Sequence, residues 1–151
     1  MTAPVQKTIT VPTDPQRAFE VFTAKLGTWW PASYSIGDSP AVDFVMEPVA
    51  GGRWYEVGED GSECETGRVL AWDPPNRLLL AWHLDGHWSY DPDPEASSEI
   101  EIRFIADGDA TRVELEHRGL ERHRTAADEL RTSIDGEGGW GSLLALYAAA
   151  V

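Results

Sequence analysis

The chain has little of the chemistry that builds disulfides, thiol metal sites or membrane spans. Its single cysteine, Cys64, excludes a disulfide framework and a cysteine-rich metal centre. No apolar run is long enough to cross a bilayer, and the N-terminal MTAPVQKTITV lacks the basic region and apolar core of a secretory signal. We therefore expect a cytoplasmic protein with no membrane partner.

Basic side chains are also scarce. Twelve Lys and Arg residues stand against 26 Asp and Glu residues, which leaves a formal net charge of -14 at pH 7. Nucleic acid and anionic membrane surfaces attract basic proteins and repel a chain of this charge. We therefore expect neither among its partners, and we interpret the acidic excess as a solubility feature.

The common catalytic signatures are missing as well. The sequence contains no GxSxG, HExxH, CxxC or GxxxxGK[ST], which removes the commonest hydrolase, metalloprotease, redox and phosphate-loop functions. One GxGxxG match, Gly136–Gly141, opens a predicted helix but follows no strand. Too little chain comes after it for the acidic residue that binds a ribose, so we predict no dinucleotide and no other cofactor.

What the chain does have is a regular order of strand and helix signals within one domain, residues 1–151. Alternation from Val5 to Val11 predicts a strand, and Asp14 before Pro15 predicts a capped helix. The remaining patterns predict a loop at 31–40, a strand at 42–47, three strands within 51–83, an irregular segment at 84–97, strands at 98–107 and 110–118, a short helix at 124–133 and a closing helix at 138–150. This order predicts an α+β fold, with an antiparallel sheet covered by helices from near the two ends of the chain.

Turn lengths predict which residues face one another across the hairpins. The turn at Gly108-Asp109 pairs Phe104 with Val113, Ile102 with Leu115, Ile100 with His117, and Arg103 with Glu114. A turn at 73–76 pairs Ala71 with Leu78, Val69 with Leu80, and Gly67 with Trp82, where the glycine leaves room for the indole. Extending this register sets Trp54 opposite Gly67 and Glu56 opposite Glu65. Two carboxylates then share the apolar face, and a single β-bulge would reverse that result.

Several segments resemble one known family. The segments VPTDPQRAFEVFT, WWP, GGRW, GRVLAWDPPNRLLLAW and the late GGW resemble the bacterial family named after the C-terminal domain of the heat-shock-protein-90 ATPase activator. That family belongs to the START-like, helix-grip (SRPBCC) superfamily. The resemblance implies a curved antiparallel sheet that grips a long C-terminal helix, with an internal cavity between them. It also implies a histidine in the loop after WWP, where this chain has Tyr34.

An apolar cavity in such a fold is the usual place for a small-molecule site. We predict that a largely apolar organic ligand is held by Trp29, Trp30, Trp54, Glu56, Leu80, Trp82, Ile102, Phe104, Leu115, His117, Trp140 and Tyr147. The alternative for each apolar residue is plain core packing. Trp29 and Trp30 either flank the cavity mouth or anchor the end of the first helix.

Three polar residues are candidates for catalysis. Glu56 and Glu65 on one apolar face would repel each other and lose hydration, so at least one pKa should rise and suit a general acid or base. His117 lies on the same face at a strand end. Lys7 is at an inward-facing position of the first strand, where its positive charge would balance a carboxylate. The alternatives are that both carboxylates are solvated and that the histidine is a hydrogen-bonded core residue.

A metal site is not expected. His83, Asp85 and His87 form a loose metal pattern in HLDGH, but His83 has outward parity, His87 falls in a loop, and no further ligand converges on them.

Three functions remain open. The first is a carrier or binding protein for a small organic ligand, and the second is a cofactor-free enzyme that uses acid–base chemistry. The third is a protein-interaction module related to the chaperone activator, which would need an exposed apolar patch on the convex face of the sheet. The binding protein is the preferred prediction, and a homodimer is compatible with each of the three.

Overall fold

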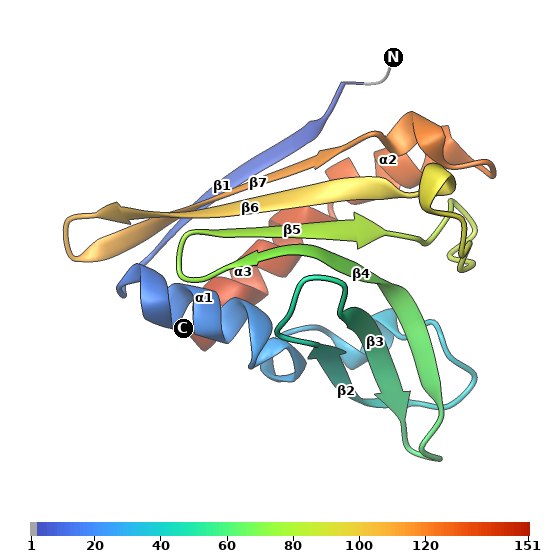
Figure 1. Cartoon of the computed structure of the whole chain (residues 1–151), viewed down its shortest axis with the longest axis horizontal. Coiled ribbons are helices and arrows are strands. Elements are labelled where there is room, and N and C mark those ends of the chain that lie inside the picture. Colours follow the sequence, from blue (N-terminus) through green and yellow to red (C-terminus); the bar gives the residue numbers. More distant parts are fainter. Residues whose placement is uncertain (1–2) are drawn as a thin grey trace.

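The structure, a computed structural model, describes residues 3–151 and contains one sheet with helices packed on it (Figure 1). Its strands are β1 (Val5–Val11), β2 (Ala41–Met46), β3 (Arg53–Gly58), β4 (Glu63–Asp73), β5 (Arg77–Trp82), β6 (Ser98–Asp107) and β7 (Ala110–Arg118). Its α-helices are α1 (Pro15–Thr23), α2 (Ala127–Asp135) and α3 (Trp140–Ala150). Four 3-10 turns complete the order: η1 (Leu26–Thr28), η2 (Ala32–Tyr34), η3 (Pro94–Ala96) and η4 (Leu120–Arg122).

All neighbouring strands are antiparallel, in the order β1-β7-β6-β5-β4-β3-β2. The first strand of the chain, β1, is therefore an edge strand that pairs with the last strand, β7. The sheet curves, and α3 runs diagonally behind it with α1 and α2 at its two ends (Figure 1). This arrangement confirms the predicted α+β class, a curved antiparallel sheet that grips the C-terminal helix.

The first helix begins where its sequence predicts. The Asp14 carboxylate accepts a hydrogen bond from Arg17 N at 2.8 Å, and Pro15 fills the first position, where no N–H is needed. The helix buries Ala18, Phe19 and Phe22. Tyr147 of α3 donates its hydroxyl to the Ala18 carbonyl at 2.7 Å, so the two helices are joined by a buried hydrogen bond as well as by apolar packing.

The last hairpin has the predicted register. Gly108 adopts a left-handed φ of 63° in its turn, and the pairs Phe104–Val113, Ile102–Leu115, Ile100–His117 and Arg103–Glu114 all form. Alternate residues of β6 and β7 therefore point into the core, where Ile100, Ile102 and Val113 are fully buried.

The β4–β5 hairpin departs from the predicted register by one residue. Gly67 pairs with Trp82 and Val69 with Leu80 as expected, but Ala71 pairs with Leu79 rather than Leu78. Leu70 is the extra residue of a bulge and is exposed. The bulge restores inward parity to Trp72, whose ring packs edge-on against Phe19 at 5.0 Å.

A second bulge, in β4, separates the two glutamates that the sequence places together. Trp54 pairs with Gly67 as predicted, but the next pair is Tyr55–Glu65, which leaves Thr66 as the extra residue. Glu56 therefore lies opposite Cys64, and the prediction that Glu56 faces Glu65 is wrong. Past the bulge the two side chains point to opposite faces of the sheet.

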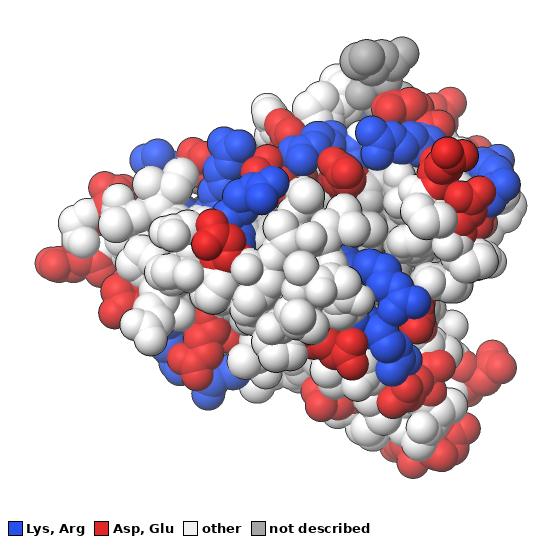
Figure 2. Space-filling view, in the orientation of Figure 1, with Lys and Arg blue, Asp and Glu red and all other residues white. Residues whose placement is uncertain are grey.

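The outer face of the sheet carries an alternating array of charges. Figure 2 shows basic and acidic side chains intermixed over β6 and β7, with acidic side chains dominating the tip of the β3–β4 hairpin. Glu101 lies within the array and accepts hydrogen bonds from Arg77 at 2.5 Å and Arg118 at 2.9 Å. Burial alone would raise the pKa of Glu101, but these two arginines outweigh it and lower that pKa to about 2.

Candidate functional site

A cavity of about 610 Å³ opens at one end of the sheet, beside the first turn of α3. This volume lies in the range of sites for drug-sized ligands. Its walls come from the loop after Trp30, the inner faces of β2 to β5, the loop after β5 and the start of α3. The lining residues are Trp30, Ser33, Tyr34, Ser35, Ile36, Phe44, Glu56, Thr66, Trp82, Leu84, His87, Trp88, Ser89, Gly138 and Leu143.

Aromatic side chains form much of the apolar wall. Trp30 and Trp82 line the cavity and both contact Trp54, at ring-centroid distances of 5.9 and 5.6 Å. Trp140 packs behind them, 5.9 Å from Trp30 and 6.3 Å from Trp82. The indole N–H of Trp82 donates to the Leu84 carbonyl at 2.9 Å, which fixes the plane of its ring. The wall is therefore a packed cluster in which each ring supports the next.

The polar feature of the cavity is Glu56. Its side chain is buried, with the residue 3% exposed, yet it lines the cavity. The carboxylate accepts a 2.8 Å hydrogen bond from Ile36 N and a second from the Ser35 hydroxyl. Glu56 forms no ion pair with the cationic side chains of residues 3–151. A buried carboxylate with two local donors has lone pairs to spare and can accept a further hydrogen bond from a ligand hydroxyl.

Glu65 and Lys7, which the sequence associates with Glu56, belong to other contacts. Glu65 lies on the outer face, where it accepts hydrogen bonds from Arg53 at 3.0 Å and Tyr90 at 2.9 Å. Burial would raise the pKa of Glu65, but those hydrogen bonds and the nearby arginines lower it overall. Lys7 pairs with Asp135 at 3.0 Å. Glu56 and Glu65 therefore do not share the cavity, so the expected repulsion between them, which would have raised the pKa of one of them, is absent.

Both ring nitrogens of His117 are hydrogen-bonded. Trp140 Nε1 donates to its Nδ1 at 3.0 Å, so the neutral ring carries its proton on Nε2 and donates to Ser98 Oγ at 2.7 Å. Ser98 in turn contacts His123 Nε2 at 2.8 Å. Burial, with a smaller contribution from repulsion by His123, lowers the pKa of His117 to about 3. The ring supports Trp140 from behind the cavity wall.

The structure divides the predicted ligand-binding residues into two groups. Trp30, Glu56 and Trp82 line the cavity. The others are buried in the packed core away from its lining, and they are Trp29, Trp54, Leu80, Ile102, Phe104, Leu115, His117, Trp140 and Tyr147. Trp29, for example, donates its indole N–H to the Val21 carbonyl at 2.9 Å and packs 5.4 Å from Tyr147, at the end of the first helix.

Most cavity residues that the sequence does not single out lie on two loops. Ser33, Ser35 and Ile36 follow the WWP segment, where Tyr34 also donates its hydroxyl to the Gly138 carbonyl at 2.8 Å. A second group, His87 to Ser89, lies in the segment after β5. Irregular loops carry no periodicity from which orientation follows. Phe44 is different, because its buried position on β2 follows the alternation of that strand.

The HLDGH segment places its histidines apart. His83 is buried, with its Nδ1 2.7 Å from the Asp91 carbonyl and its ring stacked on Tyr90. His87 is exposed at the cavity rim. Within residues 3–151 no three His, Cys, Asp or Glu side chains are grouped to hold a metal ion, and no helix there is long and apolar enough to span a membrane.

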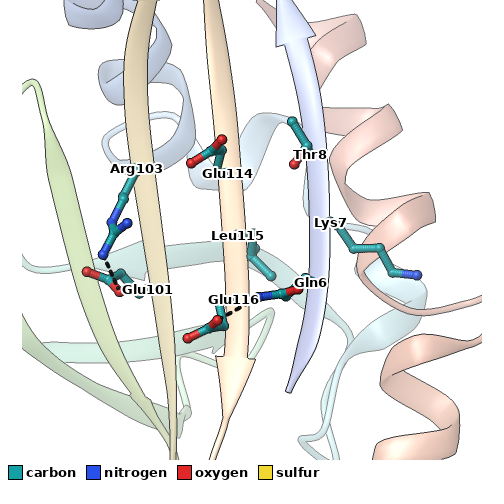
Figure 3. Close-up of a pocket in the computed structure, with 8 residues that line it drawn as sticks. All are labelled: Gln6, Lys7, Thr8, Glu101, Arg103, Glu114, Leu115 and Glu116. Atoms are coloured by element: carbon teal, nitrogen blue, oxygen red, sulfur yellow. Dashed lines mark hydrogen bonds and ion pairs between the residues drawn. The ribbon is translucent and has the colours of Figure 1, made fainter. Parts of the chain in front are cut away.

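A smaller depression of about 280 Å³ lies on the outer face between β1, β6 and β7 (Figure 3). In Figure 3, Gln6 donates to Glu116 and Arg103 pairs with Glu101, while Lys7 points to the other side of β1. The polar side chains around this depression are thus largely satisfied by one another. The larger cavity with aromatic walls is the stronger candidate for a ligand site.

A curved antiparallel sheet around a C-terminal helix, with a cavity at one end, defines a protein of the helix-grip class. The chain belongs to the family described as Activator of Hsp90 ATPase homolog 1-like protein, whose model matches residues 12–150. No protein of curated function matches it.

The solved structures that resemble this chain include two that are more than 30% identical to it in sequence. An anthrahydroquino-γ-pyrone synthase, Txn09, solved as a complex, is 39% identical with a TM-score of 0.71, and the match covers 99% of this chain and 97% of that one. The self-sacrificing resistance protein CalC from Micromonospora echinospora is 33% identical with a TM-score of 0.69, covering 97% and 92%. The Aha1 dimer from Colwellia psychrerythraea is 17% identical with a TM-score of 0.64, covering 99% and 96%, and shows the shared fold.

Proposed function

We infer that this protein binds a small, largely apolar organic molecule with an aromatic ring system and at least one hydroxyl group. The observation that carries this proposal is the cavity of about 610 Å³, which combines tryptophan walls with one buried carboxylate. The flat faces of tryptophan side chains suit planar rings. A carboxylate that forms no ion pair within residues 3–151 suits a hydroxyl donor. The similarity to an anthrahydroquino-γ-pyrone synthase supports a ligand of this chemistry.

Blocking the cavity from α3 tests the proposal. Leu143 lines the cavity, whereas Leu146 on the same helix is exposed, so the pair offers a matched control. We expect 1,8-dihydroxyanthraquinone to bind the wild-type protein with one-to-one stoichiometry by isothermal titration calorimetry. Leu143→Trp should weaken that binding by about tenfold or more because the indole fills ligand volume, and Leu146→Trp should leave it unchanged.

Two results would contradict this function. One is failure of the wild-type protein to bind the probe, and the other is equal binding by a folded Leu143→Trp variant, as judged by circular dichroism. Native mass spectrometry of the protein purified from its own host supplies an independent check, because a preformed cavity should retain an organic molecule.

A second function, a cofactor-free enzyme, is favoured by the environment of Glu56 together with the 39% identity to a synthase. In this proposal the Glu56 carboxylate accepts a proton from a hydroxyl of the bound ligand, and the hydroxyl oxygen attacks a ligand carbonyl to give a cyclic hemiketal. The carboxyl group then returns its proton to the former carbonyl oxygen, which leaves as water as the neighbouring CH2 loses a proton, and the closed ring becomes unsaturated. Ser35 and the Ile36 N–H hold the carboxylate in place through their hydrogen bonds. His117 takes no part, because its two ring nitrogens are occupied by Trp140 and Ser98.

The Glu56→Gln variant distinguishes the enzyme from the binding protein. An anthraquinone with an open 1,3-diketone side chain next to a phenol is a suitable substrate, because ring closure gives a γ-pyrone that absorbance can follow. An enzyme should lose turnover by about a hundredfold or more in this variant while still binding 1,8-dihydroxyanthraquinone. Equal turnover by wild type, variant and buffer would leave binding as the function.

A further inference from the structure

Trp88 combines a costly backbone conformation with an exposed indole. Its φ of 63° is in the left-handed region, which it shares only with Ala126 among the non-glycine residues of the described chain. A bulky side chain in that region is strained, and such strain persists only where the surroundings impose it. The residue nevertheless leaves 45% of its surface exposed. The strained backbone therefore does not serve to bury the indole in the core.

The loop that carries Trp88 is tightly braced by Asp85. The Asp85 carboxylate accepts hydrogen bonds from His87 N at 2.8 Å and Ser89 N at 3.1 Å. The Asp85 backbone pairs with Trp88 N and Ser89 O, both at 3.0 Å. A bridge between Leu84 and Tyr90 closes the loop at its base. Five residues of chain are thus held by a continuous set of hydrogen bonds, which is unusual order for an exposed loop.

A second loop supports this one from outside. Gly86 N donates to the Thr125 carbonyl at 2.9 Å, and a Cβ at Gly86 would lie 2.0 Å from the Ala126 carbonyl oxygen. The approach is too close for any side chain, so only glycine fits. The two strained residues, Trp88 and Ala126, therefore lie on loops that pack directly against each other.

The indole of Trp88 faces the cavity. It is part of the cavity lining and lies 6.4 Å from Trp82, ring centroid to ring centroid, at an interplanar angle of 78°. Trp82 thus contacts the Trp88 indole edge to face, while a large part of the Trp88 surface stays exposed. We propose that Trp88 determines the specificity of the cavity by stacking on a planar aromatic ring system of the ligand, an inference that rests on the proposed ligand-binding function.

The proposal is tested with two probes of similar bulk. 1,8-Dihydroxyanthraquinone is planar and aromatic, whereas androstanol is a saturated polycycle with one hydroxyl group. Trp88→Gly should weaken binding of the anthraquinone by about tenfold, and Trp88→Phe should restore it to within about threefold of wild type, measured by calorimetry. Androstanol affinity should fall by less than that of the anthraquinone in both variants, because a saturated ring gains apolar contact from the indole but no aromatic stacking.

Ala126→Gly is the matched control, since it relieves the other left-handed residue without touching the cavity lining. It should bind the anthraquinone as wild type does. Undiminished anthraquinone binding by Trp88→Gly, or equal weakening of the two probes, would overturn the stacking role. Failure of the wild-type protein to bind the anthraquinone would instead overturn the proposed function together with this inference.

Discussion

Glu101 lies among three arginines on the outer face of the sheet, and its side chain is only 10% exposed. The carboxylate contacts Arg77, Arg118 and Arg103 at 2.5, 2.9 and 3.3 Å. Within residues 3–151, loss of this nearly buried carboxylate leaves Arg77 and Arg103 without an ion-pair partner, while Arg118 keeps Glu99 and Glu116. This single residue therefore contributes far more than an ordinary surface ion pair.

We expect Glu101→Gln to lower the free energy of unfolding by about 2–3 kcal/mol at pH 7, measured by urea titration. The folded pKa of about 2 lies below that of the unfolded chain, so this stability is present above about pH 4.5 and is lost as the pH falls toward 2. The difference between wild type and variant should shrink over the same range.

Glu114→Gln is the control for this prediction. Glu114 pairs with Arg112 alone at 3.1 Å, and its side chain is 39% exposed. Its loss should cost no more than about 0.5 kcal/mol. Equal effects of the two substitutions would show that the arginine cluster adds nothing to stability.

At the level of elements, strands β4 and β5 approach each other closely at Gly67. The sequence predicts its pairing with Trp82, and that pairing is confirmed. The predicted reason is different, however, because a Cβ at Gly67 would meet the Ala81 carbonyl oxygen at 1.8 Å and the Trp54 ring at 3.4 Å rather than the Trp82 indole. Backbone cannot yield as a side chain can, so the position admits glycine alone.

Gly67→Ala should therefore destabilise the protein by about 3 kcal/mol or more, because the strands must separate to admit a methyl group. Gly141→Ala provides the contrast, since a Cβ there meets nothing within 4 Å and the residue lies exposed in α3. It should raise stability by about 0.5–1 kcal/mol through helix propensity. Thermal melts of both variants measure the pair, and a neutral Gly67→Ala would contradict the close approach.

The same elements show how far sequence reasoning extends. Pairs in a regular hairpin with a two-residue turn, such as Phe104–Val113, were predictable because turn length sets the register. The bulges at Thr66 and Leu70 were not predictable, because tertiary packing rather than turn length decides where a strand takes up an extra residue. The bulge at Thr66 is also what puts Glu65 on the outer face, whereas Glu56 faces inward through the regular alternation of β3.

For the whole molecule, the order of strands and helices predicted an antiparallel sheet covered by helices, and the family resemblance implied that the sheet is curved and grips the C-terminal helix. The location of the cavity was not predictable in the same way. The middle of the sheet is filled by side chains such as Leu80, Ile102 and Tyr147, and the cavity lies at the end where two irregular loops form part of its walls. Loop residues such as Trp88 take their orientation from tertiary contacts, which leave no pattern in sequence.

Acid should destabilise the whole fold through His117, which is fully buried. The unfolded chain binds a proton at this histidine below about pH 6.5, whereas the folded protein does so only near its pKa of about 3. The depressed pKa therefore gives stability that is complete above about pH 6.5 and is lost as the pH falls toward 3. Between pH 7 and 5 the loss amounts to about 2 kcal/mol from this one group.

His117→Gln isolates this contribution. A glutamine amide can accept from Trp140 Nε1 and donate to Ser98 Oγ, the two contacts that the ring makes, but it does not titrate. Urea titrations at pH 7 and pH 5 should show that the variant loses about 2 kcal/mol less than wild type over this interval, although it starts from a lower stability at pH 7. Parallel losses in the two proteins would mean that the folded state accepts a proton at His117 as readily as the unfolded chain, and the buried network would then not depend on the neutral ring.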